Sequence, residues 1–412
     1  MKDITGGVCA PKGFKAGGIW CGIKANSKKR DLALIYSEKA CTAAAMFTTN
    51  KVQAACIKVS QEHIAGGKLR AIIANSGNAN ACTGEAGLQA ARRMAELAAD
   101  EFAISGNEVA VASTGVIGVP LPIAAIESSI EALANSLSGD EAGHSAALDA
   151  IMTTDIRKKE ISVEVMVGNV PVRIGAMCKG SGMVHPNMAT MLCFITCDAH
   201  ISSDALDKSL RKAVELSFHR MTIDGDTSTN DCVIIMASGN AENKEITSGT
   251  MDHDFFTRVL TEICVRLSRE IARDGEGATK LITVSVGGAA DDNTACVFAK
   301  SVASSSLVKA AIFGADANWG RVLCALGYAG PDFNPSTTKV DFRSSAGTIN
   351  VCSRGGSVPF SEDAAKNILS QNEIEIVIDL GAGSPDYLGG QATVWGCDLS
   401  YDYVKINGNY RS

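Results

Sequence analysis

Aromatic residues are scarce in this sequence, because phenylalanine, tyrosine and tryptophan together make up 5% of its 412 residues. No run of about 18 apolar residues occurs, so we expect no membrane-spanning helix. The amino end, MKDITGGVCAPKGFKAGG, lacks the continuous apolar core of a secretory signal. Glycine is plentiful instead, and its 40 copies predict many tight loops and close packing of small side chains.

An excess of positive charge is also missing. The 38 lysines and arginines are outnumbered by 45 aspartates and glutamates, which leaves a net charge of -7. This balance argues against nucleic acid or an anionic membrane as the main partner. A locally basic pocket is still compatible with the total, so small anionic substrates are not excluded.

Cysteine is abundant, with 14 copies, yet nothing in the sequence indicates export. Most cysteines lie in apolar contexts, such as Cys232 within NDCVIIM and Cys264 within TEICVRL, where cysteine acts as a small core residue. We therefore expect reduced thiols rather than disulfides, and a cytoplasmic protein.

Length and periodicity predict the architecture. A chain this long predicts two or three domains. Apolar residues at helical spacing predict four helices. They run around Leu88, Met94 and Leu97; through Ile123, Ile126, Ile130 and Leu133 after Pro122; from a cap at Ser203 through Leu206, Leu210, Val214 and Phe218; and through Phe256, Val259, Leu260, Ile263, Leu267 and Ile271, closed by Asp274-Gly275.

Short segments rich in β-branched residues predict strands between these helices. They are LRAIIAN, EVAVAST, ISVEVMVG, VPVRIGAM, MLCFITC, DCVIIMAS, KLITVSV, LVKAAIF, KVDFR, TINVCS, EIEIVIDL and DYVKIN. Residues 161–175 alternate around a Gly-Asn pair, which is typical of a hairpin. Hairpins mixed with helices favour a mixed, layered α/β architecture over a doubly wound parallel sheet.

One junction stands out, where the loop KGSGMVHPNMA runs directly into the apolar segment MLCFI and Thr190 lies between them. The glycines permit strained backbone, and Pro186 forces His185 toward an extended shape. A hydroxyl at the start of a buried strand can attack the preceding carbonyl, that of Ala189, and water can then cleave the resulting ester. Thr190 would gain a free α-amino group, with a pKa of about 8, that serves as base to its own hydroxyl. The pattern alone favours an ordinary loop-to-strand threonine.

The segment KGSGMVHPNMATML resembles the signature of the ornithine acetyltransferase (glutamate N-acetyltransferase) family of arginine biosynthesis. Other segments are similar to that family in the same order along nearly the whole chain. They are GVCAPKGFKAGGI (7–19), FTTNKVQAA (47–55), ANSGNANACTG (74–84), STGVIGVPLP (113–122), MTTD (152–155), TIDGDTSTND (222–231), ARDGEGATK (272–280), FGADANWGR (313–321) and VKINGNYRS (404–412).

The resemblance implies a layered αββα-type sandwich with a smaller second α/β domain. It also implies self-cleavage between Ala189 and Thr190 into an amino-terminal chain, 1–189, and a carboxyl-terminal chain, 190–412. The two chains would remain associated as an α2β2 heterotetramer. In a ping-pong reaction, Thr190 would take acetyl from N-acetylornithine, release ornithine and pass acetyl to glutamate.

The resemblance further assigns roles to individual residues. Thr114 and Gly115 would form the oxyanion hole for each tetrahedral intermediate. Lys179 would meet a substrate carboxylate and Glu276 an ammonium. The complete set of implied substrate contacts is Thr153, Lys179, Thr190, Glu276, Asn407 and Ser412. No metal or tightly bound cofactor is implied, because the threonine ester carries the acetyl group, and acetyl-CoA as a further donor stays open.

Three alternatives remain at this stage. Lys179 and Glu276 are ordinary solvated charges if the resemblance is set aside. A self-processing aminopeptidase or amidohydrolase of related fold would use water as the acyl acceptor. A non-enzymatic binding protein would keep a single intact chain.

Metal sites fit the sequence poorly. His185, Cys193, Cys197 and His200 have zinc-binding side chains, but in a strand the two cysteines would lie about 13 Å apart. The segment DGDTSTND lacks the glutamate that a calcium loop needs at its twelfth position. We interpret it as a turn that supports the site, with Asp224, Asp226 and Asp231 unassigned.

Overall fold

The structure, a computed structural model, describes residues 1–24, 27–185, 191–381 and 389–409. Its chain divides into two compact units, and each is described by itself. The first unit comprises Met1–Gly180, Asn187–His219 and Thr227–Leu267, and the second comprises Ser181–Pro186, Arg220–Asp226 and Ser268–Ser412. These units do not coincide with the two predicted chains, because residues from both sides of the predicted cleavage point contribute to the first unit.

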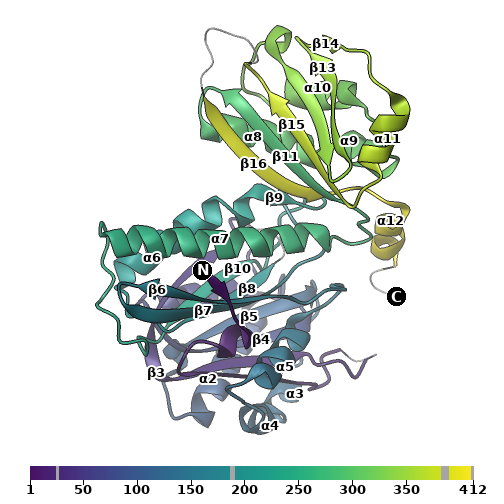
Figure 1. Ribbon diagram of the computed structural model, residues 1–412. Helices are drawn as coiled ribbons and strands as arrows, with labels where there is room; N and C mark the ends of the chain where they lie inside the picture. The colour runs from purple at the N-terminus through teal and green to yellow at the C-terminus, as the bar shows by residue number, and fades with distance from the viewer. Residues whose placement is uncertain (25–26, 186–190, 382–388, 410–412) are drawn as a thin grey trace. The chain divides into compact units, whose positions relative to one another are not determined.

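The first unit is built on a nine-stranded mixed sheet (Figure 1). Its strands follow the order β1-β6-β7-β8-β10-β3-β4-β5, and β2 pairs with β3 beside this path. The strands are β1 Lys2–Asp3, β2 Phe14–Ile19, β3 Leu32–Phe47, β4 Lys68–Asn78, β5 Val109–Val116, β6 Lys159–Val167, β7 Val170–Lys179, β8 Leu192–Cys197 and β10 Cys232–Ala237. The predicted β6–β7 hairpin is confirmed, with Val167 opposite Val170.

Strand β3 takes part in two portions of this sheet. Its first half pairs with β2 and β4, its second half pairs with β10, and the β4 register shifts between Tyr36 and Cys41. A long strand with a register shift can bend, which lets one sheet fold into layers. β3 therefore joins the strands around β4 and β5 to those around β8 and β10.

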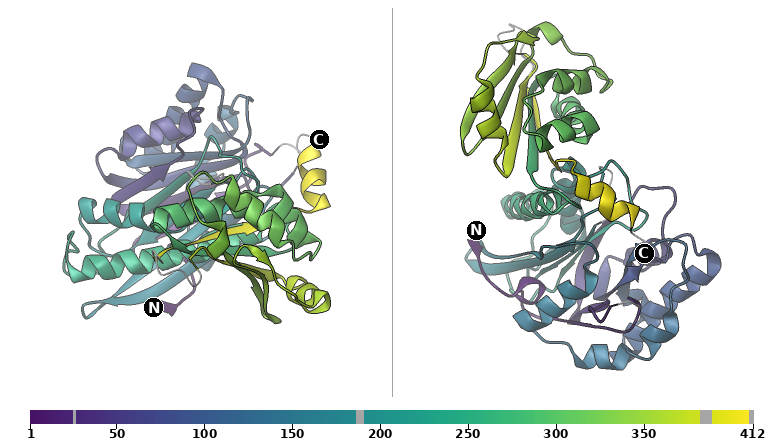
Figure 2. Two further views of the ribbon diagram at one scale, coloured as in Figure 1. Left: turned by 90° about the horizontal axis from the view of Figure 1, so that it is seen from above. Right: turned by 90° about the vertical axis from the view of Figure 1, so that its right-hand side faces the viewer.

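Helices cover both sides of this layered sheet. In Figure 2 the blue helices lie on one side, and the teal and green helices α6 and α7 lie on the other. The helices are α1 Ala55–Ile64, α2 Gly84–Glu101, α3 Ile123–Glu127, α4 Ile130–Asn135, α5 Glu141–Ile151, α6 Ser203–Glu215 and α7 Met251–Arg273, whose last turns belong to the second unit.

The predicted strand MLCFITC is β8, and every residue of it is buried. Leu192 and Phe194 belong to the core that contains β3, β4, β5 and helices α1 to α5. Burial and the neighbouring thiols Cys178 and Cys264 raise the pKa of Cys193 well above its usual range, and Cys264 lies on α7. A strand buried on both faces explains its continuous apolar sequence.

The second unit has its own seven-stranded sheet, in the order β14-β13-β12-β15-β11-β16-β9. Its strands are β9 Met221–Thr222, β11 Leu281–Ala289, β12 Lys339–Ser344, β13 Gly347–Ser353, β14 Gly356–Ser357, β15 Glu373–Asp379 and β16 Gly390–Cys397. Its helices are α8 Asp292–Ser304, α9 Ser306–Phe313, α10 Trp319–Gly327, α11 Glu362–Leu369 and α12 Tyr401–Gly408. The mixed α/β class, the layered sandwich and the smaller second domain are thus confirmed.

Four local predictions are wrong. LVKAAIF forms α9 and DYVKIN lies in α12, because Ser305 and Ser400 cap these helices through their hydroxyls. The helix predicted through residues 123–133 is two short helices, α3 and α4, separated by two serines. The cap of α6 is Ser202 rather than Ser203, since the Ser202 hydroxyl accepts from the amide of Ala205.

All fourteen cysteines are free thiols. Among the described residues no single helix is long and apolar enough to cross a membrane, although α8 and α9, joined at a 59° bend, meet that test together.

The burial of β8 generates a stability prediction. Cys193→Ser places a hydroxyl in a fully buried apolar position, so we expect the free energy of unfolding to fall by about 1–3 kcal/mol. Cys324→Ser, at an exposed thiol, is the matched control and should change little. Urea unfolding followed by circular dichroism measures both, and equal stability of the two variants would contradict the assignment of Cys193 to the core.

Candidate active site

Thr114 and Gly115 lie near the end of β5, where β4 runs parallel to it and Gly77 lies opposite Gly115. Thr114 is buried, and Gly115 has a φ of 135°, a conformation that favours glycine. A Cβ on Gly115 would lie 2.3 Å from the carbonyl carbon of Gly77 and 2.5 Å from the amide nitrogen of Asn78. The two backbones therefore approach so closely that only glycine fits at position 115.

Lys179 is the last residue of β7, and its side chain is 3% exposed. Its ammonium donates to the Thr114 hydroxyl oxygen at 3.3 Å and lies 3.9 Å from Asp155 Oδ2. Because an ammonium can only donate, Thr114 accepts in this bond and keeps its own hydroxyl proton for another acceptor. The pair is thus arranged so that Thr114 can donate to a developing negative charge.

Asp155 lies at the centre of this group, and its carboxylate is fully buried. Its oxygens accept from Lys159 Nζ at 2.7 Å, from the Gly180 amide at 2.7 Å and from the Thr153 amide at 3.1 Å. Burial raises the pKa of this carboxyl group, but Lys179 and Lys159 outweigh it and hold the pKa well below the usual range. Asp155 therefore fixes both Lys179 and the Thr153 backbone.

The predicted nucleophile Thr190 and the cleavage residue Ala189 lie outside the described residues. Met191, which follows Thr190, donates its amide proton to Asp231 Oδ1 at 3.0 Å. Leu192 pairs with Lys179 on one side and with Cys232 on the other. Lys179 and Asp231 therefore flank the first described residues after the predicted cleavage point.

Asp231 is a fully buried carboxyl group. Burial raises its pKa well above the usual range, while the amide of Met191, the nearby hydroxyl of Ser228 and the charge of Lys179 lower it. Its second oxygen has no hydrogen-bond partner among the described residues. A buried carboxyl with an unused oxygen is typical of functional sites.

Two further predicted residues meet in the second unit. Asn407 Nδ2 donates to Glu276 Oε2 at 2.9 Å, and Glu276 is 7% exposed. The Glu276 carboxylate also lies against the backbone of Gly182, where an added Cβ would come within 2.3 Å of it. The third predicted residue near this end of the chain, Ser412, lies outside the described residues.

The DGDTSTND segment, predicted to be a turn that supports the site, accepts hydrogen bonds from backbone amides at this junction. Asp224 accepts the amide protons of Met183 and Val184, in the second unit. Asp231 accepts that of Met191, in the first unit. The same short segment thus accepts hydrogen bonds from two residues before the predicted cleavage point, Met183 and Val184, and from one residue after it, Met191.

The structure therefore brings Thr114, Gly115, Thr153 and Lys179 together in the first unit and Glu276 with Asn407 in the second. The alternative of ordinary solvated charges is wrong for Lys179 and Glu276, because both are buried. Sequence reasoning missed Asp155 and Lys159 and left Asp231 without a role. The available signal was the acid that follows the threonines in MTTD.

The residues of the rejected metal site have other surroundings. His185 faces the Thr222 hydroxyl at 3.1 Å in the second unit, Cys193 and Cys197 are buried in β8, and the His200 side chain is 54% exposed. Across the described residues, no three His, Cys, Asp or Glu side chains are grouped so that they could hold a metal ion.

Comparison with known proteins decides the family. The ArgJ family model matches residues 15–412. The chain belongs to the ArgJ family. The arginine biosynthesis bifunctional protein ArgJ of Caldanaerobacter subterraneus subsp. tengcongensis is 48% identical over 412 residues, with 100% of both chains covered. The protein of the same name from Symbiobacterium thermophilum is 49% identical over 413 residues, again with 100% of both chains covered.

A solved structure of the arginine biosynthesis bifunctional protein ArgJ from Bacillus halodurans is 44% identical to the present ArgJ-family chain. The match covers 53% of this chain and 98% of the other, with a TM-score of 0.49.

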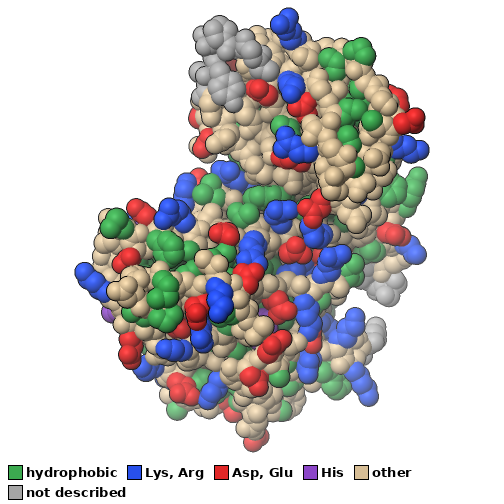
Figure 3. Space-filling model, in the orientation of Figure 1, with side chains coloured by type: hydrophobic (Ala, Val, Ile, Leu, Met, Phe, Trp, Pro, Cys, Tyr) green, Lys and Arg blue, Asp and Glu red, His purple; other side chains and the backbone are tan. Residues whose placement is uncertain are grey.

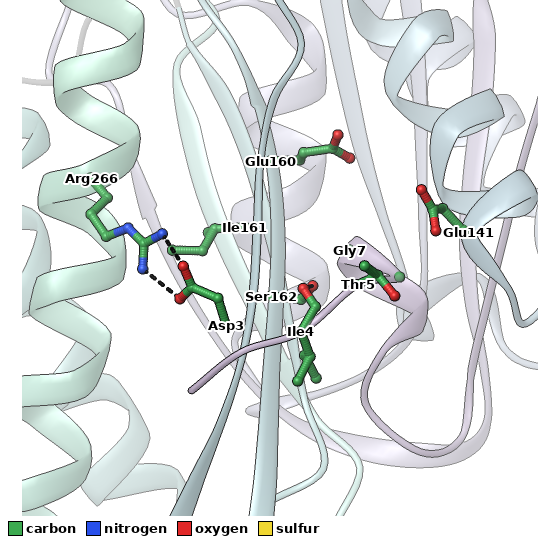
Figure 4. Close-up of a pocket in the computed structure, with 10 residues that line it drawn as sticks. Asp3, Ile4, Thr5, Gly7, Glu141, Glu160, Ile161, Ser162 and Arg266 are labelled. Carbon is green, nitrogen blue, oxygen red and sulfur yellow. Dashed lines mark hydrogen bonds and ion pairs between the residues drawn. The ribbon is translucent and has the colours of Figure 1, made fainter. Parts of the chain in front are cut away.

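A cavity of about 210 Å³ near the amino terminus of this ArgJ-family chain contains none of the predicted site residues (Figure 4). Arg266 of α7 forms two hydrogen bonds of 2.8 Å to the carboxylate of Asp3, which joins β1 to that helix. Glu160 also lines the cavity and contacts the buried His144. We interpret this region as structural, because Asp3 binds Arg266 and Glu160 binds His144.

The close approach at Gly115 generates a prediction with an internal control. Gly115→Ala adds a steric clash to an unfavourable φ, so we expect a loss of about 2–5 kcal/mol of stability. Gly118 also has a positive φ, 80°, but its added Cβ would meet nothing within 4 Å. Gly118→Ala should therefore lose about 1–2 kcal/mol. Thermal unfolding compares the two, and a Gly115 variant as stable as the Gly118 variant would contradict the packing described.

The buried charges around Asp155 generate a second prediction. Asp155→Asn leaves Lys159 buried without its carboxylate, so we expect a loss of about 3–5 kcal/mol at neutral pH. Asp149→Asn removes a partly exposed partner of Arg30 and Lys158 and should cost about 1 kcal/mol or less.

The same pair of variants should differ in pH dependence. The pKa of Asp155 is lower in the folded chain than in the unfolded chain, so its contribution is complete above the unfolded value of about 4 and is lost as pH falls below it. In the Asp155→Asn variant, the free energy of unfolding should therefore fall less steeply than in the wild type as the pH drops below about 4. An equally steep fall in that variant would exclude the assigned role.

Proposed function

We propose that this chain transfers acetyl from N-acetylornithine to glutamate, in arginine biosynthesis, through an acetyl ester of Thr190. Membership of the ArgJ family supports this, since relatives that match it along its whole length are named arginine biosynthesis bifunctional proteins. The structural observation that carries the proposal is the buried Thr114–Lys179 hydrogen bond beside the start of β8. It supplies a donor and a positive charge where an acyl intermediate would need them.

In the proposed first half-reaction, Thr190 Oγ attacks the acetyl carbonyl carbon and its own α-amino group takes the hydroxyl proton. The tetrahedral oxyanion accepts from the Thr114 hydroxyl and the Gly115 amide, while Lys179 holds the Thr114 oxygen and adds positive charge. Collapse breaks the C–N bond, and ornithine leaves with the proton. In the second half-reaction, the glutamate amine attacks the ester carbon and restores the threonine hydroxyl.

The remaining substrate contacts follow the chemistry of the described side chains. Lys179 suits a substrate carboxylate because it is a buried cation. Thr153 suits a hydrogen bond through its hydroxyl, since its amide is occupied by Asp155. Glu276, hydrogen-bonded to Asn407, suits the distal ammonium of ornithine. Ser412 belongs to the same proposal on the family pattern alone.

Self-cleavage between Ala189 and Thr190 is part of the proposal, and the sheet supports a stable product. Strand β8 pairs antiparallel with β7, from Lys179–Leu192 to Ile174–Cys197, and β10 pairs antiparallel with β3. Chains 1–189 and 190–412 would thus remain joined by backbone hydrogen bonds on two strands. We further propose an α2β2 heterotetramer of such pairs, without a metal or tightly bound cofactor. A cytoplasmic location is proposed because all fourteen thiols are free.

Replacing Thr190 tests the proposal. Thr190→Ala removes the nucleophile, so we expect a single 42.8 kDa band on a denaturing gel and no acetylglutamate from N-acetylornithine. Thr190→Ser keeps a hydroxyl and should retain part of both activities. Thr247→Ala, at an exposed threonine, is the control and should behave as the wild type.

Two results would contradict the proposal. One is full transfer by the Thr190→Ala variant. The other is release of free acetate by the wild type without any acetylation of glutamate, which would indicate a hydrolase that uses water as the acceptor.

A further inference from the structure

Asn230 is a buried residue that lies two positions before β10, and the proposed acetyl transfer gives it no role. Thr48 holds the backbone on either side of it. The Thr48 amide donates to the carbonyl oxygen of Asp231 at 3.0 Å, and the Thr48 hydroxyl donates to the carbonyl oxygen of Ser228 at 2.7 Å. The backbone that carries the Asn230 side chain is therefore fixed in position.

The side-chain amide of Asn230 joins two segments that are distant from it in the sequence. Its Nδ2 atom donates to the carbonyl oxygen of Ala79 at 2.6 Å and to that of Ser113 at 2.9 Å. Its Oδ1 atom accepts from the Thr229 hydroxyl at 2.6 Å. Because carbonyl oxygens can only accept, the amide nitrogen must face Ala79 and Ser113 and the amide oxygen must face Thr229. The side chain therefore has one orientation.

The two carbonyl groups that Asn230 binds lie next to the proposed oxyanion hole. Ser113 directly precedes Thr114, so its carbonyl group and the Thr114 amide belong to one planar peptide unit. Ala79 donates its own amide proton at 3.0 Å to the carbonyl oxygen of Val116, the residue that follows the glycine of the proposed hole. Asn230 thus holds the chain before the hole directly and the chain after it through Ala79.

The same side chain connects two portions of the layered sheet. Asn230 precedes β10, whereas Ser113 belongs to β5, and β3 and β4 lie between these strands in the order of the sheet. In Figure 1, β8 and β10 lie above β4 and β5. Cys232, the first residue of β10, pairs with Leu192, the first residue of β8. Asn230 therefore links the end of β5 to the strand pair that begins just after the proposed nucleophile.

Only uncharged groups form this link. Figure 3 shows Lys and Arg side chains mixed with Asp and Glu side chains over the face of the molecule that it draws. The side chains of Asn230 and Thr229 and the carbonyl groups of Ala79 and Ser113 are instead buried and neutral. Buried polar groups that satisfy one another in this way hold a fixed geometry, and that geometry does not depend on pH, because none of them titrates.

We propose that Asn230 is a positioning residue for the acetyl transfer, whose side-chain amide sets the distance between the oxyanion hole at Thr114 and Gly115 and the start of β8. This inference rests on the proposed function and deepens it. Asn230 acts through the backbone of Ser113 and Ala79 rather than by touching the substrate. An oxyanion-hole donor works only within hydrogen-bond distance of the oxygen that becomes charged, so displacing the hole slows the chemical step more than it weakens substrate binding.

Kinetics of the Asn230→Ala variant tests the inference. We expect kcat for transfer from N-acetylornithine to glutamate to fall about 10- to 100-fold, with KM changed less than about twofold. Acetylation of Thr190 and its deacetylation by glutamate both pass through a tetrahedral intermediate, so their single-turnover rates should fall by a similar factor. The pH dependence of kcat should keep the shape of the wild type, because Asn230 does not titrate. Labelled acetyl trapped on Thr190 counts the competent enzyme, and rates are compared per competent site.

Asn243→Ala is the matched control. Asn243 is also buried, and its Nδ2 atom donates to two backbone carbonyl oxygens, those of His200 at 3.1 Å and Lys244 at 2.7 Å. It lies beyond the other end of β10, away from the proposed oxyanion hole. Its replacement should cost a similar amount of stability, measured by thermal unfolding, and leave kcat within about twofold of the wild type.

Thr229→Val tests the same link by a milder change and decides the matter if Asn230→Ala does not fold. Valine has nearly the shape of threonine but cannot donate to Asn230 Oδ1, so the amide loses the contact that orients it. We expect kcat to fall about three- to tenfold while KM stays unchanged.

The inference is overturned if folded Asn230→Ala, or Thr229→Val in its place, matches Asn243→Ala in kcat per competent site, or if its defect lies in KM alone. The proposed function would then stand, because the wild type would still acetylate glutamate. If the wild type releases acetate without acetylating glutamate, the proposed acceptor is wrong, and the same comparison made on acetate release decides the role of Asn230. A wild type that forms neither product overturns the proposed function and the inference together.

Discussion

The carboxylate of Asp155 holds the proposed catalytic group of the first unit, Thr114 and Lys179, in place. A carboxylate without exposure to water is costly unless cations and amide protons surround it, and here Lys159, Lys179 and the amides of Thr153 and Gly180 do so. Lys179 is consequently held at the end of β7, where its ammonium reaches Thr114. The position of Thr114, the proposed oxyanion-hole residue, thus depends on Asp155 through Lys179.

The sheet of the first unit is suited to a chain that is cut. The predicted cleavage point immediately precedes β8, which lies between β7 and β10. Strand pairing in both directions would hold the new end after the bond is broken, and the continuous burial of β8 opposes its withdrawal. Such a fold can place a free α-amino group next to a hydroxyl without losing the core around it.

The sequence correctly predicted the helices and strands that have a strong hydrophobic periodicity. Helix α7, strand β8 and the β6–β7 hairpin could be predicted from periodicity, whereas Gly115 was selected by the family resemblance. Strands β2 and β3 were missed, because β3 is rich in alanine and its first six residues are all buried, so it shows little alternation. Helices α9 and α12 were predicted as strands, because the short apolar runs carried more weight than the serine caps before them.

Part of the candidate site was also selected before the structure was known. Family resemblance selected Thr114, Thr153, Lys179, Glu276 and Asn407, and the structure buries Lys179 and Glu276 against their partners. Asp155 and Asp231 could not be selected, because a single sequence does not show which carboxylates are buried or which cations face them.

The acetyl-threonine intermediate is the central claim, and mass spectrometry of trapped enzyme tests it most directly. Active protein is mixed with N-acetylornithine that carries a labelled acetyl group, without glutamate, then denatured and digested. We predict the label on a peptide whose first residue is Thr190. Active protein in which residue 190 is still joined to Ala189, or in which the label lies on another residue, would contradict the account.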